Sequence, residues 1–337
     1  MYEIRLCRYD EINKLQSFID IHWKKDHILS INTSLLKWQH FNKEDNVLNF
    51  VVAWDSVTDT FIGILGFIPL NHFDKKLNSG DLWLAIWKVA ENNTQPGLGL
   101  LLFEYLEEKY GPKSIGSIGI NLRVKKVYDL LKFQTNKTNQ YYYLNSCKDF
   151  RIAEIPILAE RPSPLNSNFI LSKIDDLKKI SNFNINYKPF KSIQYLINRY
   201  QQHPIYTYSF YLISSDQKEF AILVLRKVSL NNSSCLRIVD VLGDLSKIGS
   251  LESALNEMLK EHNAEYIDCI NFGIEEETFK KLGFQKRNNE VIIPNYFEPF
   301  EKKNIDIQFA IKTDYNNYII FKGDSDQDRP NFINYGL

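Results

Sequence analysis

Apolar and polar positions in the first half of the chain follow strand and helix periods in a regular order. Continuous or alternating apolar runs indicate strands, and apolar residues three and four positions apart indicate helices. Short polar stretches separate them, such as Asp55 to Asp59, which fits a hairpin connection between two strands. In chain order we expect a strand over 3–7, helices over 11–22 and 33–41, and strands over 47–54, 61–70 and 81–90.

The turn after the strand over 81–90 is glycine-rich. It reads Glu91-Asn92-Asn93-Thr94-Gln95-Pro96-Gly97-Leu98-Gly99, and helical spacing of apolar residues begins at Leu98. The first turn of a helix leaves backbone N–H groups without intrahelical partners, and the helix dipole adds partial positive charge there. Glycine at 97 and 99 lets a ligand approach without meeting a Cβ atom. The segment predicts an anion site suited to a diphosphate, and a tight turn without a ligand is the alternative.

A strand, a short helix and another strand follow. Gly111-Pro112 ends the preceding helix, 114–120 reads as a short buried strand, and 124–131 reads as the next helix. That helix ends Val127-Tyr128-Asp129-Leu130-Leu131-Lys132-Phe133. The segment 137–144 carries three consecutive tyrosines, and we expect it to add the final strand to the same sheet.

These elements and two of their motifs resemble the GNAT superfamily, the acyl-coenzyme A dependent N-acyltransferases. In that family a (Gln/Arg)-x-x-Gly-x-(Gly/Ala) motif binds the diphosphate, and a (Leu/Val)-Tyr-x-x-Leu-Gly-Phe segment lines the thiol end. Here Thr94 stands where Gln or Arg is usual, and Lys132 replaces the glycine of the second motif. The first change removes a charge that could meet a phosphate, and the second touches only a helix end.

The resemblance implies acetyl-coenzyme A, or another acyl-coenzyme A, as the cofactor. The strand end would pair with the pantetheine arm, and a backbone N–H there would polarise the thioester carbonyl. Tyr128 would protonate the departing thiolate, and the alternative is a helix-face tyrosine with a surface hydroxyl. Asn121 would hold a main-chain or cofactor amide, or would simply cap its helix. The implied cofactor-binding residues are Lys88, Val89, Ala90, Thr94, Gln95, Gly97, Leu98, Gly99 and Asn121.

The sequence constrains the general base and the acceptor pocket less than it constrains the cofactor site. Glu91 follows the strand near the expected thiol channel, and we favour it as the base over Asp81 at the opposite strand end. His72 competes because histidine titrates near neutral pH, although a lone loop histidine is more often solvated. By the resemblance, the first two helices wall the acceptor pocket, where the candidate residues are Trp23, Lys24, His27 and Trp38. Packing explains the two tryptophans equally well.

The second half repeats a similar series of elements. Its last helix ends Leu282-Gly283-Phe284, which is closer to the family pattern than the ending in the first half. The turn Gly243 to Ser250 lacks Gly-x-Gly and places Asp244 where a diphosphate would lie, so we expect no coenzyme there. This half would bind substrate or brace the first. We expect helices over 191–202, 251–262 and 276–282, and strands over 206–214, 220–228, 234–242 and 266–270.

We therefore expect an α+β (mixed α/β) fold with two GNAT-like domains. Each would be a mixed, mostly antiparallel sheet flanked by helices, and the second would be diverged. Pro156, Pro162 and Pro164 lie in a stretch without helical periodicity that reads as a linker. The expected divisions are 1–150 for the catalytic domain, 151–168 for the linker, 169–310 for the second domain, and 311–337 for a C-terminal strand and acidic tail.

The acidic tail allows two interpretations. Acidic residues alternate over Asp324 to Asp328, but Arg329 stands where a calcium loop needs glycine, which argues against an EF-hand. The tail is either solvated, or it folds back and binds a polar acceptor through its carboxylates and Arg329. Such tails look similar to those of acyltransferases of bacterial surface polysaccharide synthesis.

Composition excludes several classes of protein. The 337 residues include 41 basic and 41 acidic side chains, so the formal charge of +0 gives no reason to expect nucleic acid or an anionic membrane as partner. Four scattered cysteines form no Cys-x-x-Cys pair, and His22, His27 and His40 match no zinc spacing, so no metal site is expected. No signal segment or membrane span is visible, and we expect a cytoplasmic protein.

Three functions remain open at this stage. The first is an N-acyltransferase, most plausibly an N-acetyltransferase, that acts on an amino group of a nucleotide-linked sugar in surface polysaccharide synthesis. The second is an acyltransferase of the same fold that acts on an amino acid, peptide or protein. The third is a catalytically silent tandem scaffold.

Overall fold

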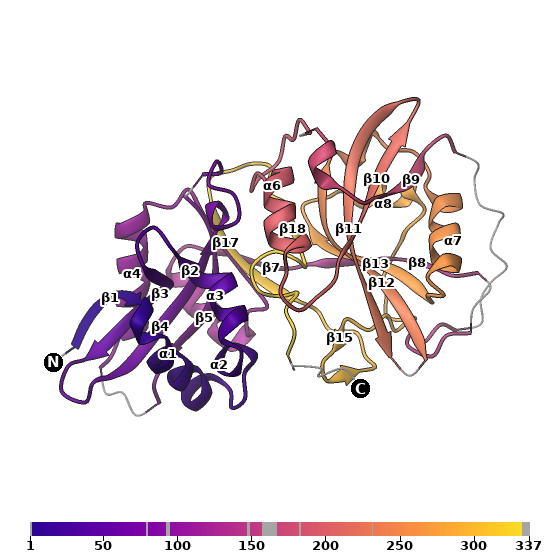
Figure 1. Cartoon of the computed structure of the whole chain (residues 1–337). Helices are drawn as coiled ribbons and strands as arrows, with labels where there is room; N and C mark the ends of the chain where they lie inside the picture. Colours follow the sequence, from indigo (N-terminus) through magenta and orange to yellow (C-terminus); the bar gives the residue numbers. More distant parts are fainter. Residues whose placement is uncertain are drawn as a thin grey trace.

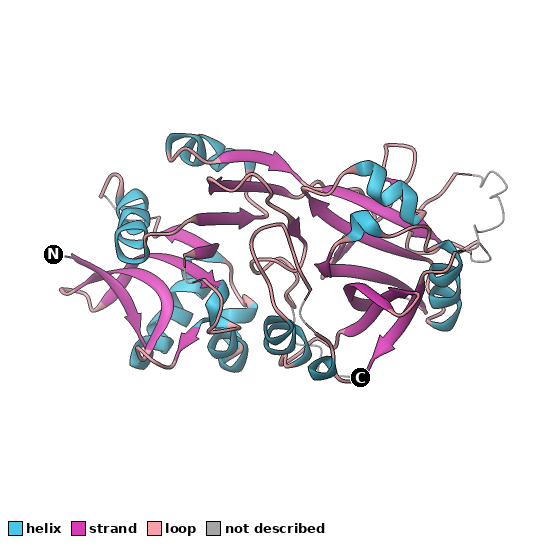
Figure 2. Ribbon diagram, turned by 90° about the horizontal axis from the view of Figure 1, so that it is seen from above, coloured by secondary structure: helices cyan, strands magenta, loops and turns pink. Residues whose placement is uncertain are grey.

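The chain forms two mixed sheets that lie side by side, each with helices packed against it (Figure 1). The computed structural model describes residues 2–78, 80–91, 95–146, 149–156, 167–181, 183–230 and 232–331. Figure 2 shows the two layered halves from above. The expected class, two mostly antiparallel mixed sheets flanked by helices, is confirmed.

The first sheet has the order β1-β3-β4-β5-β6-β17-β7, and β2 pairs with β3. All its pairings are antiparallel except that of β5 with β6. Its strands are β1 (Tyr2–Arg8), β2 (Phe41–Asn42), β3 (Val47–Asp55), β4 (Thr60–Pro69), β5 (Asp81–Val89), β6 (Ser114–Ile118), β7 (Gln134–Lys137) and β17 (Gln308–Thr313). Its helices are α1 (Ile12–Phe18), α2 (Ile28–Ile31), α3 (Thr33–His40), α4 (Leu98–Tyr110) and α5 (Lys125–Leu130), and a π-helical turn over Ile19–Trp23 extends α1.

The second sheet repeats this plan with the order β14-β8-β13-β12-β11-β10-β9, and β18 pairs with β13. Here the parallel pair is β12 with β13. Its strands are β8 (Asn139–Leu144), β9 (Ile170–Ile174), β10 (Ser209–Ser215), β11 (Lys218–Leu230), β12 (Ser233–Gly243), β13 (Tyr266–Phe272), β14 (Gln285–Lys286) and β18 (Ile320–Phe321). Its helices are α6 (Ile193–Leu196), α7 (Glu252–Glu261) and α8 (Glu276–Leu282), and β15 (Tyr296–Phe297) with β16 (Phe300–Glu301) forms a separate hairpin.

The two halves exchange a strand, which corrects the expectation for 137–144. That segment was expected to close the first sheet, but β8 instead pairs with β13 in the second sheet. In return β17 lies between β6 and β7 of the first sheet. Figure 1 shows the yellow β17 among the purple strands of the first half. Each sheet is therefore complete only when both halves of the chain are present.

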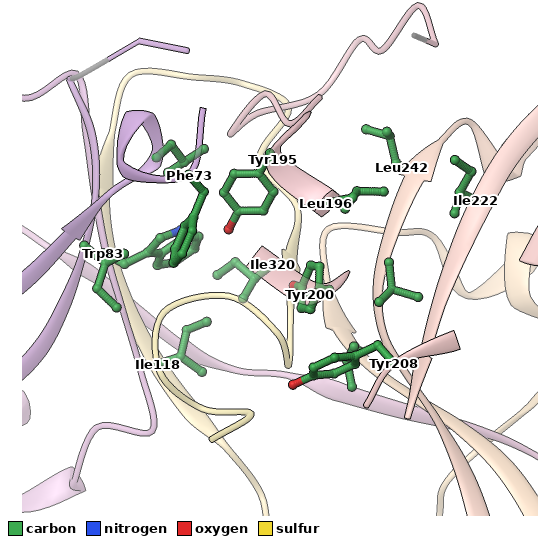
Figure 3. Close-up of a cluster of buried hydrophobic side chains, with 14 of the residues drawn as sticks. Phe73, Trp83, Ile118, Tyr195, Leu196, Tyr200, Tyr208, Ile222, Leu242 and Ile320 are labelled. Carbon is green, nitrogen blue, oxygen red and sulfur yellow. The ribbon is translucent and has the colours of Figure 1, made fainter. Parts of the chain in front are cut away.

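One apolar core continues across the boundary between the halves (Figure 3). Phe73 and Trp83 come from the first half, Tyr195 and Tyr200 from the second, and Ile320 from the C-terminal segment. Tyr195 packs edge-on against Phe73 with ring centroids 5.6 Å apart. Because this core buries apolar surface from both halves, it stabilises their relative position.

The C-terminal segment is buried between the halves. The interpretation of this segment as a solvated acidic tail is therefore wrong. Asp324, Asp326 and Asp328 are at most 5% exposed. Asp324 lies 2.7 Å from the ammonium group of Lys191, and Asp328 lies 2.7 Å from the guanidinium group of Arg226. Buried carboxylates need such partners, and here the chain itself supplies them.

Within the described ranges, no helix has the length and apolar character needed to cross a membrane. The expected linker is described only in part, because Pro162 and Pro164 lie outside the described residues. Cys147 also lies outside them. The other three cysteines are buried as free thiols.

Candidate active site

A cleft opens where β5 and β6 separate. The two strands pair in parallel from Asp81 with Ser114 to Leu84 with Ser117, and β5 then continues to Val89 without β6 beside it. The resulting cleft has a volume of about 730 Å³ and is lined by β5, the start of α4, the end of β6, α5 and the C-terminal segment. An open backbone edge next to a cavity can accept an extended ligand as an added strand.

A bulge in β5 lies at the inner end of this open edge. The register with β4 runs from Leu65 opposite Trp87 to Phe67 opposite Leu84, so Ala85 and Ile86 together face one residue of β4. Both residues line the cleft. Bulges re-aim backbone groups and are common beside functional sites.

The glycine turn leaves the start of α4 accessible. Gly97 has φ 78°, and a Cβ atom built there would meet nothing within 4 Å. Gly97 is the N-cap of α4, and it has no side chain that could accept a hydrogen bond from the first amides of the helix. The indole N–H of Trp87 donates to the carbonyl of Gly99 at 3.2 Å and fixes the turn against β5. The turn therefore leaves space beside Gly97 at the start of α4, and the anion site stays a prediction.

Two cationic side chains lie in the wall of the cleft, Lys88 and Arg123. The ammonium group of Lys88 pairs with Glu91 at 3.3 Å. The structure gives the Arg123 guanidinium no partner among the described residues, and sequence reasoning did not select it. Arg123 lies in a 3-10 turn, directly after Leu122, and the N-cap of this turn is Asn121. No sequence motif marked the position of Arg123.

Tyr128 is buried in the cleft wall, which contradicts a surface position of its hydroxyl. The residue is 5% exposed, and its hydroxyl donates to Oγ of Ser117 at 3.1 Å. Burial raises the pKa of Tyr128, and the hydrogen bond with Ser117 acts in the opposite direction. The phenol therefore keeps its proton at neutral pH, as a general acid must.

The C-terminal segment closes the inner end of the cleft. Gln327 donates to the carbonyl of Ile118 at 2.9 Å, and Ser325 donates to the carbonyl of Leu84 at 2.9 Å, so the segment bridges β5 and β6 beyond their last pair. Asp326 and Arg329 line the cleft and pair with each other at 2.5 Å. Among the described residues of the cleft lining, Asp326 is the one carboxylate. Sequence reasoning offered Arg329 and the carboxylates of the tail as acceptor-binding groups in one of two alternatives, but it did not single out Asp326 among them, because only tertiary contacts bring this segment to the cleft.

Several residues predicted from the sequence lie together in this cleft. They are Trp23, Lys88, Val89, Gly97, Gly99, Asn121, Tyr128 and Arg329. Asn121 also accepts a hydrogen bond from the N–H of Arg123 at 2.9 Å, which is the helix-cap alternative. Leu98 instead packs in the core beneath α4, and Ala90 lines a separate pocket beside α1. Gln95 is exposed outside the lining, and Thr94 lies outside the described residues.

Glu91, His27 and His72 are not among the cleft-lining residues. The Glu91 side chain is 85% exposed. His72 donates to the carbonyl of Trp38 at 2.8 Å, and burial lowers its pKa. His27 is buried with Nε2 3.1 Å from Arg329, and burial together with the charge of Arg329 lowers its pKa to about 3. Glu91 and His72, the expected base candidates, and His27, expected in the acceptor pocket, thus lie outside the described lining of the cleft.

The equivalent separation of strands in the second sheet is filled. There β12 and β13 pair from Leu236 with Ile267 to Ile238 with Cys269. Beyond this point β18 pairs with β13, and the N–H of Gly323 donates to the carbonyl of Val239 on β12 at 2.7 Å. The pocket that remains has a volume of about 250 Å³ and is lined by Asp244 and Glu275, among others.

Comparison with solved structures shows the class of fold. A GCN5-related N-acetyltransferase from Anabaena variabilis matches with a TM-score of 0.55 and 10% identity, over 92% of this chain and 72% of that one. A second GCN5-related N-acetyltransferase, from Kribbella flavida, matches with a TM-score of 0.51 and 7% identity, over 93% and 72%. A conserved Enterococcus faecalis protein of unknown function matches with a TM-score of 0.54 and 8% identity, over 93% and 73%.

The chain thus has the fold of GCN5-related N-acetyltransferases in a double-domain arrangement. No family model matches the sequence, and the search of curated proteins returned no match. The described residues contain no group of three or more histidine, cysteine or acidic side chains that could hold a metal ion.

Proposed function

We propose that this protein is an acyl-coenzyme A dependent N-acyltransferase whose active site is the cleft between β5 and β6. The carrying observation is the combination of an open strand edge over Ala85 to Val89 with a helix start whose N-cap, Gly97, has no side chain and borders the cleft. The first suits an extended amide-containing chain, and the second suits a diphosphate. Acyl-coenzyme A has both parts and supplies a thioester when bound.

Several groups in the wall of the cleft have a role in this proposal. The amides at the start of α4 bind the diphosphate, and Arg123 supplies the cationic charge that Thr94 does not provide. Lys88 lines the same wall. The bulge at Ala85 and Ile86 is the candidate source of a backbone N–H for the thioester oxygen.

Tyr128 and Asp326 are the candidate proton-transfer groups. The Tyr128 hydroxyl, oriented by Ser117, protonates the departing sulfur. Asp326 replaces Glu91 as the carboxylate that receives or orients the amine, because Asp326 lies in the cleft wall whereas Glu91 points to solvent. Its pairing with Arg329 fixes its orientation.

The acceptor is a primary amine on a polar molecule, because Tyr296, Asp326 and Arg329 form the inner end of the cleft. From the family resemblance we propose a nucleotide-linked amino sugar, with an amino acid, peptide or protein amine as the alternative.

Two measurements test the proposal. Titration calorimetry with acetyl-coenzyme A should show one site per chain, and free-thiol release should depend on an added amine drawn from a panel of amino-sugar nucleotides and amino acids. Absence of binding at about millimolar cofactor, roughly the upper end of ordinary substrate affinities, would leave only the scaffold interpretation.

A further inference from the structure

A small basic pocket adjoins the cleft on the side of the second half. It has a volume of about 60 Å³, and Tyr296, Gln327 and Arg329 line both the pocket and the cleft. A cavity of this size has room for a small ionic group and not for a nucleotide. Its remaining wall comes from the second sheet, the β15 hairpin and the C-terminal segment.

Four cations face this pocket, and three of them have carboxylate partners. Arg226 pairs with Asp328 at 2.7 Å and Arg237 with Asp268 at 2.8 Å, and neither of these aspartates lines the pocket. Arg329 pairs with Asp326. The one carboxylate in the pocket lining, Glu298, accepts hydrogen bonds from Tyr206 at 2.9 Å and from the N–H of Asn331 at 2.6 Å.

Lys322 is the fourth cation, and it is different. The residue is 5% exposed, and the structure gives its ammonium group no hydrogen bond or ion pair among the described residues. Its Nζ lies 5.9 Å from the ring centroid of Tyr296. A buried charge without a partner is costly, and an anionic ligand in the pocket would supply the missing partner.

The titration of Lys322 agrees with this geometry. Burial, together with repulsion from Arg237 and Arg226, lowers the pKa of Lys322 to about 7, while Asp328 and Asp268 act in the opposite direction. Glu298 and the ring of Tyr296 complete its polar surroundings. An anion placed in the pocket would favour the charged form, so binding should draw a proton from solution at neutral pH.

We propose that this pocket is an anion subsite that binds a carboxylate or phosphate group of the acceptor while its amine lies in the cleft. The role of the anion as part of the acceptor rests on the proposed function. The subsite itself rests on the pocket, the four cations and the unpartnered ammonium of Lys322.

The binding test uses the full-length protein saturated with coenzyme A, so that added anions do not bind at α4. Sodium phosphate and sodium acetate are titrated up to about 100 mM against sodium chloride of equal ionic strength, and the thermal midpoint is followed. We expect at least one of the two anions to raise the midpoint above the chloride control. Whichever anion acts identifies phosphate or carboxylate as the ligand chemistry.

Two variants make the binding test specific. Lys322→Met removes the unpartnered charge without leaving an orphaned carboxylate, and we expect it to fold and to weaken anion binding about tenfold or more. Lys247→Met loses the same charge at a site where the side chain is 64% exposed, and it should bind like the wild type. Equal effects of phosphate, acetate and chloride on the wild type, or unchanged anion binding in Lys322→Met, would overturn the subsite.

A second arm connects the subsite to catalysis. Ethanolamine, β-alanine and O-phosphoethanolamine carry an amine two carbons from a hydroxyl, a carboxylate or a phosphate. In wild-type protein the amine with the bound anion should have a KM at least about tenfold lower than ethanolamine, and Lys322→Met should abolish that preference while kcat with ethanolamine is retained. Anion binding without any thiol release would keep the subsite and reject the acyltransferase. A preference that persists in Lys322→Met would overturn the subsite alone.

Discussion

The two halves of the chain build the same separation of parallel strands and leave only one of them open. In the first half β5 and β6 part after Leu84 and Ser117, and the space beside them remains a cleft of about 730 Å³. In the second half β12 and β13 part after Ile238 and Cys269, and β18 with the residues after it fills the space. The chain's own backbone occupies the position that an extended ligand takes in an open cleft.

The turns that precede α4 and α7 differ in the charge that they carry. Gly97, the N-cap of α4, has no side chain. In the second half the carboxylate of Asp244 accepts from the N–H of Ser246 at 3.0 Å and pairs with Lys247 at 2.9 Å, so this turn has its own anion. The proton donor differs as well, because Phe279 stands four residues before Gly283, where Tyr128 stands before Lys132. Phe279 stacks on Tyr141 with centroids 4.0 Å apart and serves packing.

The comparison favours different roles for the two halves. The second half keeps the fold, but its strand separation is filled and its turn carries Asp244. The expectation that it binds no coenzyme stays a prediction until binding is measured. Its C-terminal segment instead supplies Asp326 and Arg329 to the first cleft.

The largest expected effect comes from loosening the segment that fills the second separation. Lys191 is buried and lies 2.7 Å from both Asp240 and Asp324. Lys191→Met leaves two buried carboxylates without their cation, and we expect a loss of about 3–5 kcal/mol in the free energy of unfolding, measured by urea titration. Lys312→Met removes a half-exposed pair with Glu107 and should cost about 0–1 kcal/mol. Equal losses in the two variants would mean that the buried cluster does not hold the segment in place.

The same cluster predicts a pH dependence of stability. Burial raises the pKa of Asp324 from 3.8 to about 6, although Lys191 acts in the opposite direction. The folded carboxyl binds its proton more tightly than the unfolded one, so this group adds stability as pH falls from about 6 towards 4, and the gain is lost as pH rises through 6. Asp324→Asn should flatten this part of the stability profile. An unchanged profile would assign the dependence to other groups.

Tyr128→Phe makes the first half resemble the second at the proposed proton donor. We expect kcat to fall about 100-fold with little change in cofactor affinity, because the ring still packs and only the hydroxyl is lost. Tyr110→Phe is the matched control, since Tyr110 packs on Phe67 and does not line the cleft. Steady-state thiol release and cofactor titration separate the two effects. Full turnover in Tyr128→Phe would remove this hydroxyl from the mechanism.

Gly97→Asp gives the first turn a carboxylate like that of the second. Repulsion between this carboxylate and a diphosphate should weaken acetyl-coenzyme A binding about tenfold or more. Gly111 is a close control because it also has positive φ and open space for a Cβ atom, at the other end of α4. Gly111→Asp should lower stability about as much as Gly97→Asp does and leave the affinity for acetyl-coenzyme A unchanged. Gly97→Asn adds a side chain of similar size without its charge. Equal affinity in all three variants would mean that the turn binds no anion.

The smallest effect is expected from Asp244→Asn in the second turn. Removing this charge should not create a second coenzyme site, because β18 still fills the space between β12 and β13. Calorimetric stoichiometry should therefore stay at one acetyl-coenzyme A per chain. A stoichiometry of two would show that charge alone, and not the inserted segment, closes the second half.

The sequence by itself determined the elements of both halves and much of the candidate cofactor site. Strand and helix periods depend on neighbouring residues, so β5, α4 and α8 could be predicted to within about two residues. Gly97, Gly99 and Tyr128 could be found for the same reason, since their motifs lie within continuous segments.

Only the tertiary structure decided which strands complete which sheet and what lies at the inner end of the cleft. The same alternating pattern serves β8 in either sheet, so local sequence did not reveal the exchange with β17. Asp326, Arg329 and Lys322 lie about two hundred residues beyond Tyr128 and reach the site through buried ion pairs and the shared core. Burial and the approach of distant charges are properties of the folded chain, and they decided between a solvated acidic tail and one that folds back to the candidate active site.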